Sequence, residues 1–166
     1  MTRSAQSPLA ATTGSAAGTR AVGARLAGVL GPGDVVLLVG ELGTGKTTLV
    51  QGLVEALGGS EAVTSPTFTL AHEYHTDPPV THIDLWRLEH LQEIVDLALD
   101  ETLDEGGIVV AEWGEAAEPL FGSDSLVVRL ERGTSDTERM ISVEAHGPSW
   151  DGRSARLAAL LQGAPA

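Results

Sequence analysis

The hydrophobic positions of the chain form unbroken runs of strand length and stretches with helical spacing. Val35–Val39 is one such run, and Ile108–Ala111, which leads directly to Glu112, is another. Runs of this kind are typical of central parallel strands that are covered on both faces. Between them, leucines at four-residue intervals mark a helix face, and a glycine pair ends it: Leu49, Leu53, Leu57, Gly58 and Gly59. Apolar strands that each feed a helix predict an α/β fold.

The remaining pattern completes this prediction. We expect further helices over residues 19–30, 91–103 and 150–161, and further strands over 68–75, 80–85, 126–131 and 140–145. The mostly parallel central sheet should carry helices on both faces, in a single domain spanning residues 18–163. Residues 1–17 are rich in Ala, Ser, Thr and Gly without apolar periodicity, so we expect a disordered tail there.

A glycine-rich segment stands between the first apolar run and its helix. Gly40, Gly45, Lys46 and Thr47 satisfy the pattern G-x-x-x-x-G-K-[ST]. In such a loop, backbone N–H groups surround an anion, the lysine reaches the β- and γ-phosphates, and the hydroxyl binds magnesium. Among 20 glycines this spacing can arise by chance, but Lys46 is the only lysine in the chain and stands where the motif needs it. We therefore predict a three-layer P-loop NTPase fold that binds a nucleotide and Mg²⁺.

Acidic residues at strand ends are candidates for the metal side of the site. A P-loop NTPase needs a carboxylate near its magnesium ion. Glu112 directly follows an apolar run and is the better candidate, and Asp84 ends the run from Val80 and is the second. Either residue could instead be merely solvated at its strand end. The chain contains no asparagine, so it lacks the Asn-Lys-x-Asp segment of guanine-specific GTPases, and we expect ATP.

Several segments together resemble the bacterial TsaE (YjeE) family, the ATPase of the tRNA threonylcarbamoyladenosine pathway. In chain order they are Gly33-Asp34, the loop from Gly40 to Thr48, Ser65-Pro66-Thr67-Phe68, His82–Leu88 and Val110–Trp113. The loop alone is shared with many proteins, and the other segments make the resemblance specific. One departure is Trp86, which stands where the family commonly has tyrosine.

The resemblance implies a role for each matching residue. Thr47 and Glu112 would hold magnesium, and Asp84 would order the metal's water or the attacking water. The segment around Ser65 would sense the γ-phosphate through Thr67. The implied nucleotide-binding residues are Glu41, Leu42, Gly43, Thr44, Gly45, Lys46, Thr47, Thr48, Thr67 and Trp113, and the implied catalytic residues are Lys46, Asp84 and Glu112. Trp113 could equally be a packing residue.

The charge and composition of the chain indicate which kinds of partner it can bind. Ten basic residues stand against 23 acidic ones, and the net charge of −13 repels a phosphate backbone. The resemblance implies that the chain joins the TsaD and TsaB proteins, which transfer threonylcarbamoyl to a tRNA adenosine, and we expect tRNA to be held mainly by these partners. The absence of cysteine and of long apolar runs favours a cytoplasmic protein with no membrane contact. We expect His72, His75 and His82 to be solvated or packed rather than metal ligands.

Two other functions are compatible with the same loop. A small-molecule kinase on this fold usually carries an arginine-rich lid, whereas no arginine lies between Glu112 and Arg129. A non-catalytic nucleotide-binding subunit would signal through its bound state alone, and the presence of both Asp84 and Glu112 argues against it. Because no residue stands out as an arginine finger, we expect slow ATP hydrolysis by the chain alone and faster hydrolysis with its partners.

Overall fold

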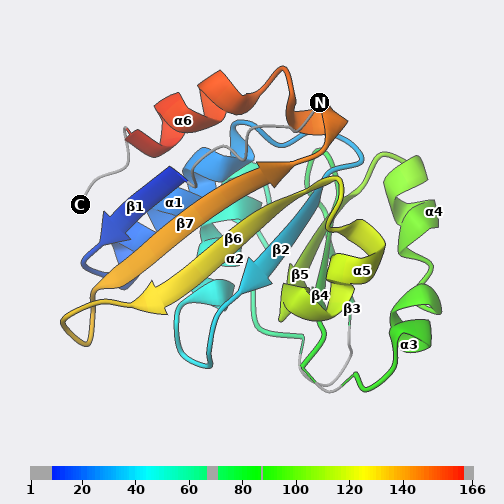
Figure 1. Ribbon diagram of the computed structural model, residues 1–166, viewed down its shortest axis with the longest axis horizontal. Helices are drawn as coiled ribbons and strands as arrows, with labels where there is room; N and C mark the ends of the chain where they lie inside the picture. Colours follow the sequence, from blue (N-terminus) through cyan, green and yellow to red (C-terminus); the bar gives the residue numbers. More distant parts are fainter. Residues whose placement is uncertain (1–8, 67–70, 87, 163–166) are drawn as a thin grey trace, which may run out of the picture.

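Seven strands form one mixed sheet in the middle of the molecule. The computed structural model describes residues 9–66, 71–86 and 88–162, and the account that follows is confined to them. In chain order the strands are β1 (Leu9–Thr13), β2 (Val35–Val39), β3 (Ala71–Tyr74), β4 (Val80–Asp84), β5 (Ile108–Glu112), β6 (Ser125–Arg132) and β7 (Arg139–His146). Their order across the sheet is β1-β7-β6-β2-β5-β4-β3 (Figure 1). The two unbroken apolar runs, β2 and β5, therefore lie side by side in its centre.

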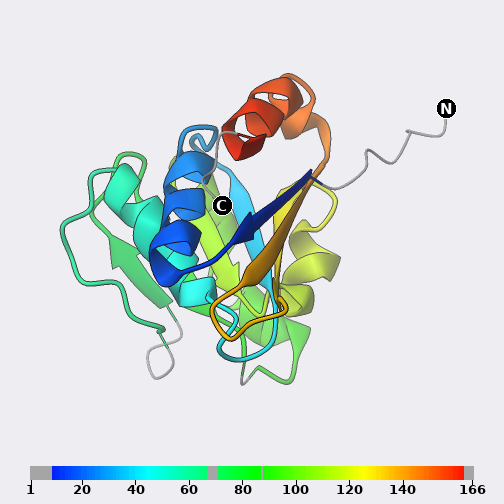
Figure 2. The same ribbon diagram turned by 90° about the vertical axis from the view of Figure 1, so that its left-hand side faces the viewer.

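Helices cover both faces of this sheet. On one face lie α1 (Ala16–Ala27), α2 (Lys46–Ala56) and α6 (Ser154–Gln162), the last preceded by the short η2 (Pro148–Trp150). On the other lie α3 (Leu91–Val95), α4 (Leu99–Asp104), η1 (Gly114–Ala117) and α5 (Glu118–Phe121). Figure 2 shows α1 and α2 on one side of the sheet and α5 on the other. The predicted α/β fold with helices on both faces is confirmed.

Strand β2 shows why its sequence is apolar throughout. Val36 and Leu38 join the buried cluster formed with α1, α2 and α6. Val35 and Leu37 join the second buried cluster, on the opposite face. Successive side chains of a strand point to opposite faces, so a strand between two helical layers must be apolar at every position.

The sheet is less parallel than the sequence predicted. Strand β2 is parallel to β5 and β6, and β4 is parallel to β5. In contrast, β1 pairs with β7, β7 with β6 and β3 with β4 in antiparallel fashion. The short connections from β3 to β4 and from β6 to β7 make hairpins, which only antiparallel strands can form. The prediction of a mostly parallel sheet is therefore wrong towards both edges, while it holds for the centre.

The N-terminal segment is ordered well before residue 18. Residues Leu9–Thr13 form the edge strand β1, paired with β7 so that Leu9 lies opposite Val143. Helix α1 then begins at Ala16, and the hydroxyl of Ser15 caps it by accepting a hydrogen bond of 3.0 Å from the N–H of Gly18. The expected disordered tail is therefore wrong for residues 9–17, and residues 1–8 lie outside the described part of the chain.

The helix predicted over residues 91–103 is divided into α3 and α4. Ala98 separates them with a left-handed backbone, φ +55°. This conformation is costly for a residue with a Cβ atom. The break allows Ile94 of α3 and Leu99 of α4 to enter the same buried cluster, and that packing accounts for it. Neither these helices nor any other in the described ranges is long and apolar enough to cross a membrane.

Helices α1 and α2 cross at glycines. A Cβ atom on Gly23 would lie 2.0 Å from the carbonyl oxygen of Leu49, and one on Gly52 would lie 1.8 Å from that of Arg20. No other residue type fits at either position without moving a helix. The two helices are therefore packed backbone to backbone, each through a glycine of its own.

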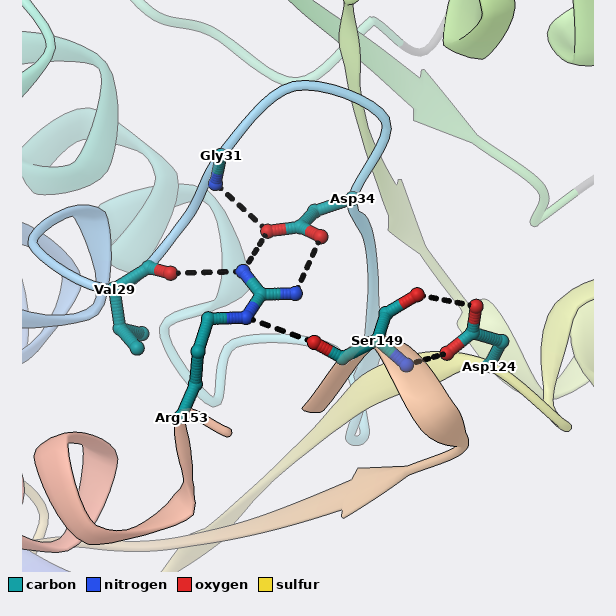
Figure 3. A network of polar contacts seen from close by, with 6 residues as sticks. All are labelled: Val29, Gly31, Asp34, Asp124, Ser149 and Arg153. Carbon is teal, nitrogen blue, oxygen red and sulfur yellow. Dashed lines mark hydrogen bonds and ion pairs between the residues drawn. The ribbon is translucent and has the colours of Figure 1, made fainter. Parts of the chain in front are cut away.

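A polar network fastens the C-terminal helix to the beginning of β2 (Figure 3). Arg153 donates from Nη1 to Oδ2 of Asp34 at 2.6 Å and from Nη2 to Oδ1 at 2.8 Å. The same guanidinium donates to the carbonyl oxygens of Val29 and Ser149, both at 3.0 Å. Asp34 also accepts from the N–H of Gly31 at 2.7 Å. This network lies at the opposite end of β2 from the glycine-rich loop.

Candidate functional site

A cavity of about 580 Å³ opens at the carboxyl ends of β2, β4 and β5. Five parts of the chain form its walls: the start of α1, the glycine-rich loop with the start of α2, the segment before β3 that carries Ser65, the ends of β4 and β5, and the hairpin between β6 and β7. The lining residues are Ser15, Ala16, Thr19, Leu42, Gly43, Gly45, Lys46, Thr47, Thr48, Ser65, Asp84, Trp86, Glu112, Trp113, Asp136, Thr137 and Arg139. In open α/β sheets this is the edge at which ligands bind.

The glycine-rich loop needs its glycines for two reasons. A Cβ atom on Gly40 would lie 2.6 Å from the carbonyl oxygen of Leu130 on β6, so the loop can leave β2 here only without a side chain. Gly43 and Gly45 have φ of +78° and +101°, which other residues rarely adopt. Gly45 is the N-cap of α2, so the unpaired N–H groups and the positive end of the helix dipole face the cavity. These features suit a phosphate group.

Lys46, the sole lysine, is folded back over this loop. Its ammonium donates to the carbonyl oxygen of Gly40 at 2.5 Å and to that of Glu41 at 3.0 Å. It also lies 3.9 Å from the ring centroid of Trp113. Burial lowers the pKa of Lys46 below its ordinary value, and the nearby carboxylates, Glu112 first among them, partly oppose this. A polyphosphate in the cavity would supply an anionic partner for this ammonium.

The hydroxyl of Thr47 meets the carboxylate of Glu112. Its Oγ1 lies 3.0 Å from Oε1 and 3.2 Å from Oε2. Glu112 is buried, and its Oε2 accepts a second hydrogen bond of 2.6 Å from Nε2 of His82, which is fully buried on β4. Within the described residues Nδ1 of His82 has no hydrogen-bond partner. The ring therefore holds the carboxylate of Glu112 through Nε2, its one hydrogen-bonding nitrogen among the described residues.

Asp84 stands beside Glu112, because β4 and β5 are parallel and these two residues are in register. Both of its oxygens accept hydrogen bonds, Oδ2 from the hydroxyl of Ser65 at 3.0 Å and Oδ1 from the N–H of Trp86 at 2.9 Å. The carboxylate is thus oriented by a side chain of one loop and the backbone of another. It faces the same cavity as Glu112.

Two tryptophans form one wall of the cavity. The rings of Trp86 and Trp113 are 4.3 Å apart between centroids and tilted by 45°. Trp113 has a left-handed backbone, φ +59°, directly after Glu112. Trp86 remains 58% exposed, and Leu42 at the tip of the glycine-rich loop is 78% exposed. The mouth of the cavity is therefore apolar and open, while its floor is charged.

The structure brings together most of the residues that the sequence singled out. Those that line the cavity are Leu42, Gly43, Gly45, Lys46, Thr47, Thr48, Asp84, Glu112 and Trp113. Glu41 and Thr44 do not line it. They close the loop instead, because the hydroxyl of Thr44 donates to the carbonyl oxygen of Glu41 at 2.8 Å. Thr67 lies outside the described residues. The roles assigned to these residues stay predictions.

Sequence reasoning missed two walls of the cavity. One is the start of α1, with Ser15 and Thr19, and the other is the hairpin after β6, with Asp136 and Arg139. It also left His82 without a specific partner. No motif marks Ser15, Thr19, Asp136 or Arg139. His82 belongs to a segment of the resemblance, and the alternation that puts it on the same face of β4 as Asp84 could have connected it to the site.

The donor set fits magnesium held jointly with a nucleotide. Among the described residues, no group of three or more His, Asp or Glu side chains is arranged to hold a metal ion alone. Thr47 and Glu112 supply a hydroxyl and a carboxylate in contact, and both are hard oxygen ligands. Magnesium is usually bound by one or two carboxylates together with substrate phosphates and water. The two protein oxygens are therefore sufficient for a metal that arrives with its nucleotide.

Comparison with known proteins assigns the chain to one family. The family model described as "Threonylcarbamoyl adenosine biosynthesis protein TsaE" matches residues 13–141. The chain is 44% identical over 138 residues to the tRNA threonylcarbamoyladenosine biosynthesis protein TsaE of Streptomyces coelicolor, covering 79% of this chain and 93% of that protein. It is 37% identical over 134 residues to the Bacillus subtilis protein of the same name, covering 80% and 83%.

A solved structure agrees with these sequence matches. The crystal structure of Bacillus subtilis YdiB superposes with a TM-score of 0.76 at 31% identity, covering 94% of this chain and 95% of that one. The range matched by the family model contains β2, β4 and β5 and the predicted site residues, which lie between positions 41 and 113. The resemblance read from the sequence is confirmed, and the chain belongs to the TsaE family.

Proposed function

We propose that this chain is the ATP-binding and ATP-hydrolysing subunit of the tRNA threonylcarbamoyladenosine machinery, acting in the cytoplasm with TsaB and TsaD. The observation that carries the proposal is the 3.0 Å contact between the hydroxyl of Thr47 and the carboxylate of Glu112 at the base of the glycine-rich loop. In P-loop NTPases a loop hydroxyl and a strand-end carboxylate of this kind bind the magnesium of the nucleotide. The names of the TsaE relatives support the pathway, and the family resemblance supports the partners.

The chemistry follows from the residues around the phosphates. Lys46 and the amides at the start of α2 bind the β- and γ-phosphates, while Thr47 and Glu112 hold Mg²⁺. When bound, Mg²⁺ neutralises charge on the phosphate oxygens. Asp84, with its two oxygens held by Ser65 and Trp86, orients the water that attacks the γ-phosphate.

Hydrolysis by the chain alone is expected to be slow. Lys46 and Arg139 are the only cationic side chains among the described residues that line the cavity. The guanidinium of Arg139 already donates to three backbone carbonyl groups, those of Gly43, Asp136 and Glu138. We therefore expect a partner to supply a further cation that stabilises the transferring phosphoryl group, a contribution typically worth a factor of about 10³ or more.

The test is ATP hydrolysis by the purified chain, alone and with the TsaB–TsaD complex and tRNA. Lys46→Ala and Glu112→Ala are the test variants, and Arg156→Ala, an exposed position on α6, is the matched control. Slow basal turnover that rises with the complex, and that both test variants lose while the control keeps it, supports the proposal. Fast turnover by the chain alone, or ATP binding without any response to the complex, contradicts the partner-dependent part. Unchanged hydrolysis in Glu112→Ala contradicts the assignment of the metal site.

A further inference from the structure

Two arginines of the β6–β7 hairpin donate hydrogen bonds to the glycine-rich loop. Nη2 of Arg132, the last residue of β6, donates to the carbonyl oxygen of Leu42 at 3.2 Å. Nη2 of Arg139, the first residue of β7, donates to the carbonyl oxygen of Gly43 at 3.2 Å. Figure 2 shows the turn of this hairpin beside the loop that follows β2. The hairpin and the loop are about 90 residues apart in the sequence, so no local pattern reveals the contact.

The placement of these arginines is unfavourable for the hairpin itself. Arg132 and Arg139 are directly opposite each other in the antiparallel register. Like charges in that position destabilise a strand pair. Within the described part of the chain neither guanidinium forms an ion pair with a carboxylate. Their polar partners are backbone carbonyl oxygens, two of them on the glycine-rich loop.

The hydrogen bond from Arg132 determines the orientation of the Leu42–Gly43 peptide group. The Leu42–Gly43 peptide is trans, so its C=O and N–H groups point in opposite directions. Gly43 lines the cavity and Arg132 does not. Because Arg132 holds the carbonyl of Leu42 from outside, the N–H of Gly43 is directed inwards, towards the position of a phosphate. A Cβ atom on Gly43 would lie 3.0 Å from Nη2 of Arg132, so the close approach also requires glycine.

We infer that Arg132 and Arg139 are positioning residues for phosphate binding: they fix the peptide groups of Leu42–Gly43 and Gly43–Thr44 so that the loop is preorganised before a nucleotide enters. This inference rests on the proposed function, since it assigns a role within the same site. Arg139 contributes more than orientation, because it belongs to the cavity wall and adds positive charge there. A bound polyphosphate lowers the cost of the two opposed cations, so phosphate binding and hairpin pairing stabilise each other.

The test compares a ligand that has phosphates with one that has none. Affinities for Mg·ADP and for adenosine are measured by calorimetry on the wild type, Arg132→Ala and Arg139→Ala. Arg129→Ala is the matched control, because Arg129 lies on the same strand, is partly exposed and pairs with Glu118 rather than with the loop. Each test variant is expected to bind Mg·ADP about three- to tenfold more weakly, the usual effect of losing one hydrogen bond at a partly exposed site, with adenosine unaffected. Lysine at either position should restore part of the loss, because an ammonium can donate to the same carbonyl.

A second measurement does not depend on nucleotide. Backbone ¹⁵N relaxation of the free protein should show an ordered Gly43 amide in the wild type and in Arg129→Ala, and a more mobile one in Arg132→Ala and Arg139→Ala. Equal loss of Mg·ADP and adenosine binding, or no loss of either together with unchanged relaxation, overturns the inference. If the wild type binds no Mg·ADP at all, the proposed function fails. The relaxation result then decides by itself whether the arginines order the loop.

Discussion

The ion pair between Asp34 and Arg153 gives a quantitative prediction about stability (Figure 3). Asp34→Ala removes two charge-assisted hydrogen bonds, of 2.6 and 2.8 Å, and the acceptor of the Gly31 N–H. It leaves the guanidinium, which also stacks on Trp150 at 3.9 Å, without its carboxylate. Breaking a fully buried pair in this way costs about 3–5 kcal/mol. Because the side chain of Arg153 is 26% exposed and water can replace part of the loss, we expect about 2–4 kcal/mol.

The measurement is unfolding by urea and by heat. For a domain of this size a loss of that order lowers Tm by roughly 5–15 °C. Arg156→Ala, an exposed arginine on the same helix, should stay within about 0.5 kcal/mol of the wild type. The double variant Asp34→Ala/Arg153→Ala should cost clearly less than the sum of the two single changes, because the second change removes a charge that has already lost its partner.

Two results would refute this reasoning. One is an Asp34→Ala protein that unfolds within about 0.5 kcal/mol of the wild type, which would mean that water replaces the pair at no cost. The other is strict additivity in the double-variant cycle, which would mean that the two residues stabilise the fold separately. Nucleotide binding should be retained in all three variants at temperatures where they are folded, because the network lies at the far end of β2 from the cavity.

Two further predictions concern the histidines. His82→Leu removes the donor that holds Glu112, and we expect it to raise the Mg²⁺ concentration for half-maximal ATP hydrolysis about tenfold, with a smaller rise for His82→Gln, which keeps an N–H group. The pKa of His75 should lie above its ordinary value because its Nδ1 is 2.6 Å from the carboxylate of Glu61, and Glu61→Gln should return it towards that value. Any stability from this pair is therefore complete below the ordinary histidine pKa and is lost as pH rises through the elevated one, which ring-proton NMR titration can follow.

Each of these predictions has a clear opposite outcome. An unchanged Mg²⁺ dependence in His82→Leu, in a protein whose Tm shows that it is folded, would show that Glu112 needs no support from the ring. Equal midpoints for His75 in the wild type and in Glu61→Gln would show that the contact does not persist in solution. Glu55→Gln, a change on the exposed face of α2, is the control for the titration and should leave the midpoint of His75 in place.

The centre of the fold was predictable from the sequence because its signals are local. An unbroken run such as Val35–Val39 indicates a strand covered on both faces, and the glycine-rich segment after it marks the strand-to-helix turn. The edges were not predictable in this way. Residues Leu9–Thr13 have no strong strand pattern, and they become β1 only because β7 offers an unpaired edge some 130 residues later. Likewise, the left-handed Ala98 that divides α3 from α4 follows from packing rather than from propensity.

The residues of the site also differ in whether a local sequence signal identifies them. Lys46, Thr47 and Glu112 were identified because the chemistry of each is tied to a position next to a strand or a helix. Asp84 and Glu112 lie side by side because β4 and β5 are parallel and in register, which the sequence suggested but could not demonstrate. Arg139 was not identified, because its contact with the loop depends on the place of the β6–β7 hairpin in the sheet, where β6 pairs with β2.

The glycine contact between α1 and α2 determines which parts of the site can move. Helix α1 carries Thr19 at one wall of the cavity, and α2 carries Lys46 at another, while Gly23 and Gly52 lock the two helices together at backbone distance. The position of Thr19 relative to the glycine-rich loop is therefore fixed by the helix pair, and its methyl carbon lies 3.4 Å from where a Cβ atom on Gly45 would be. We expect any closure around a bound ligand to come from other walls of the cavity, such as those that Ser65 and Trp86 form from loops. We therefore expect a partner that responds to the nucleotide-bound state to contact the protein near Ser65 and Trp86.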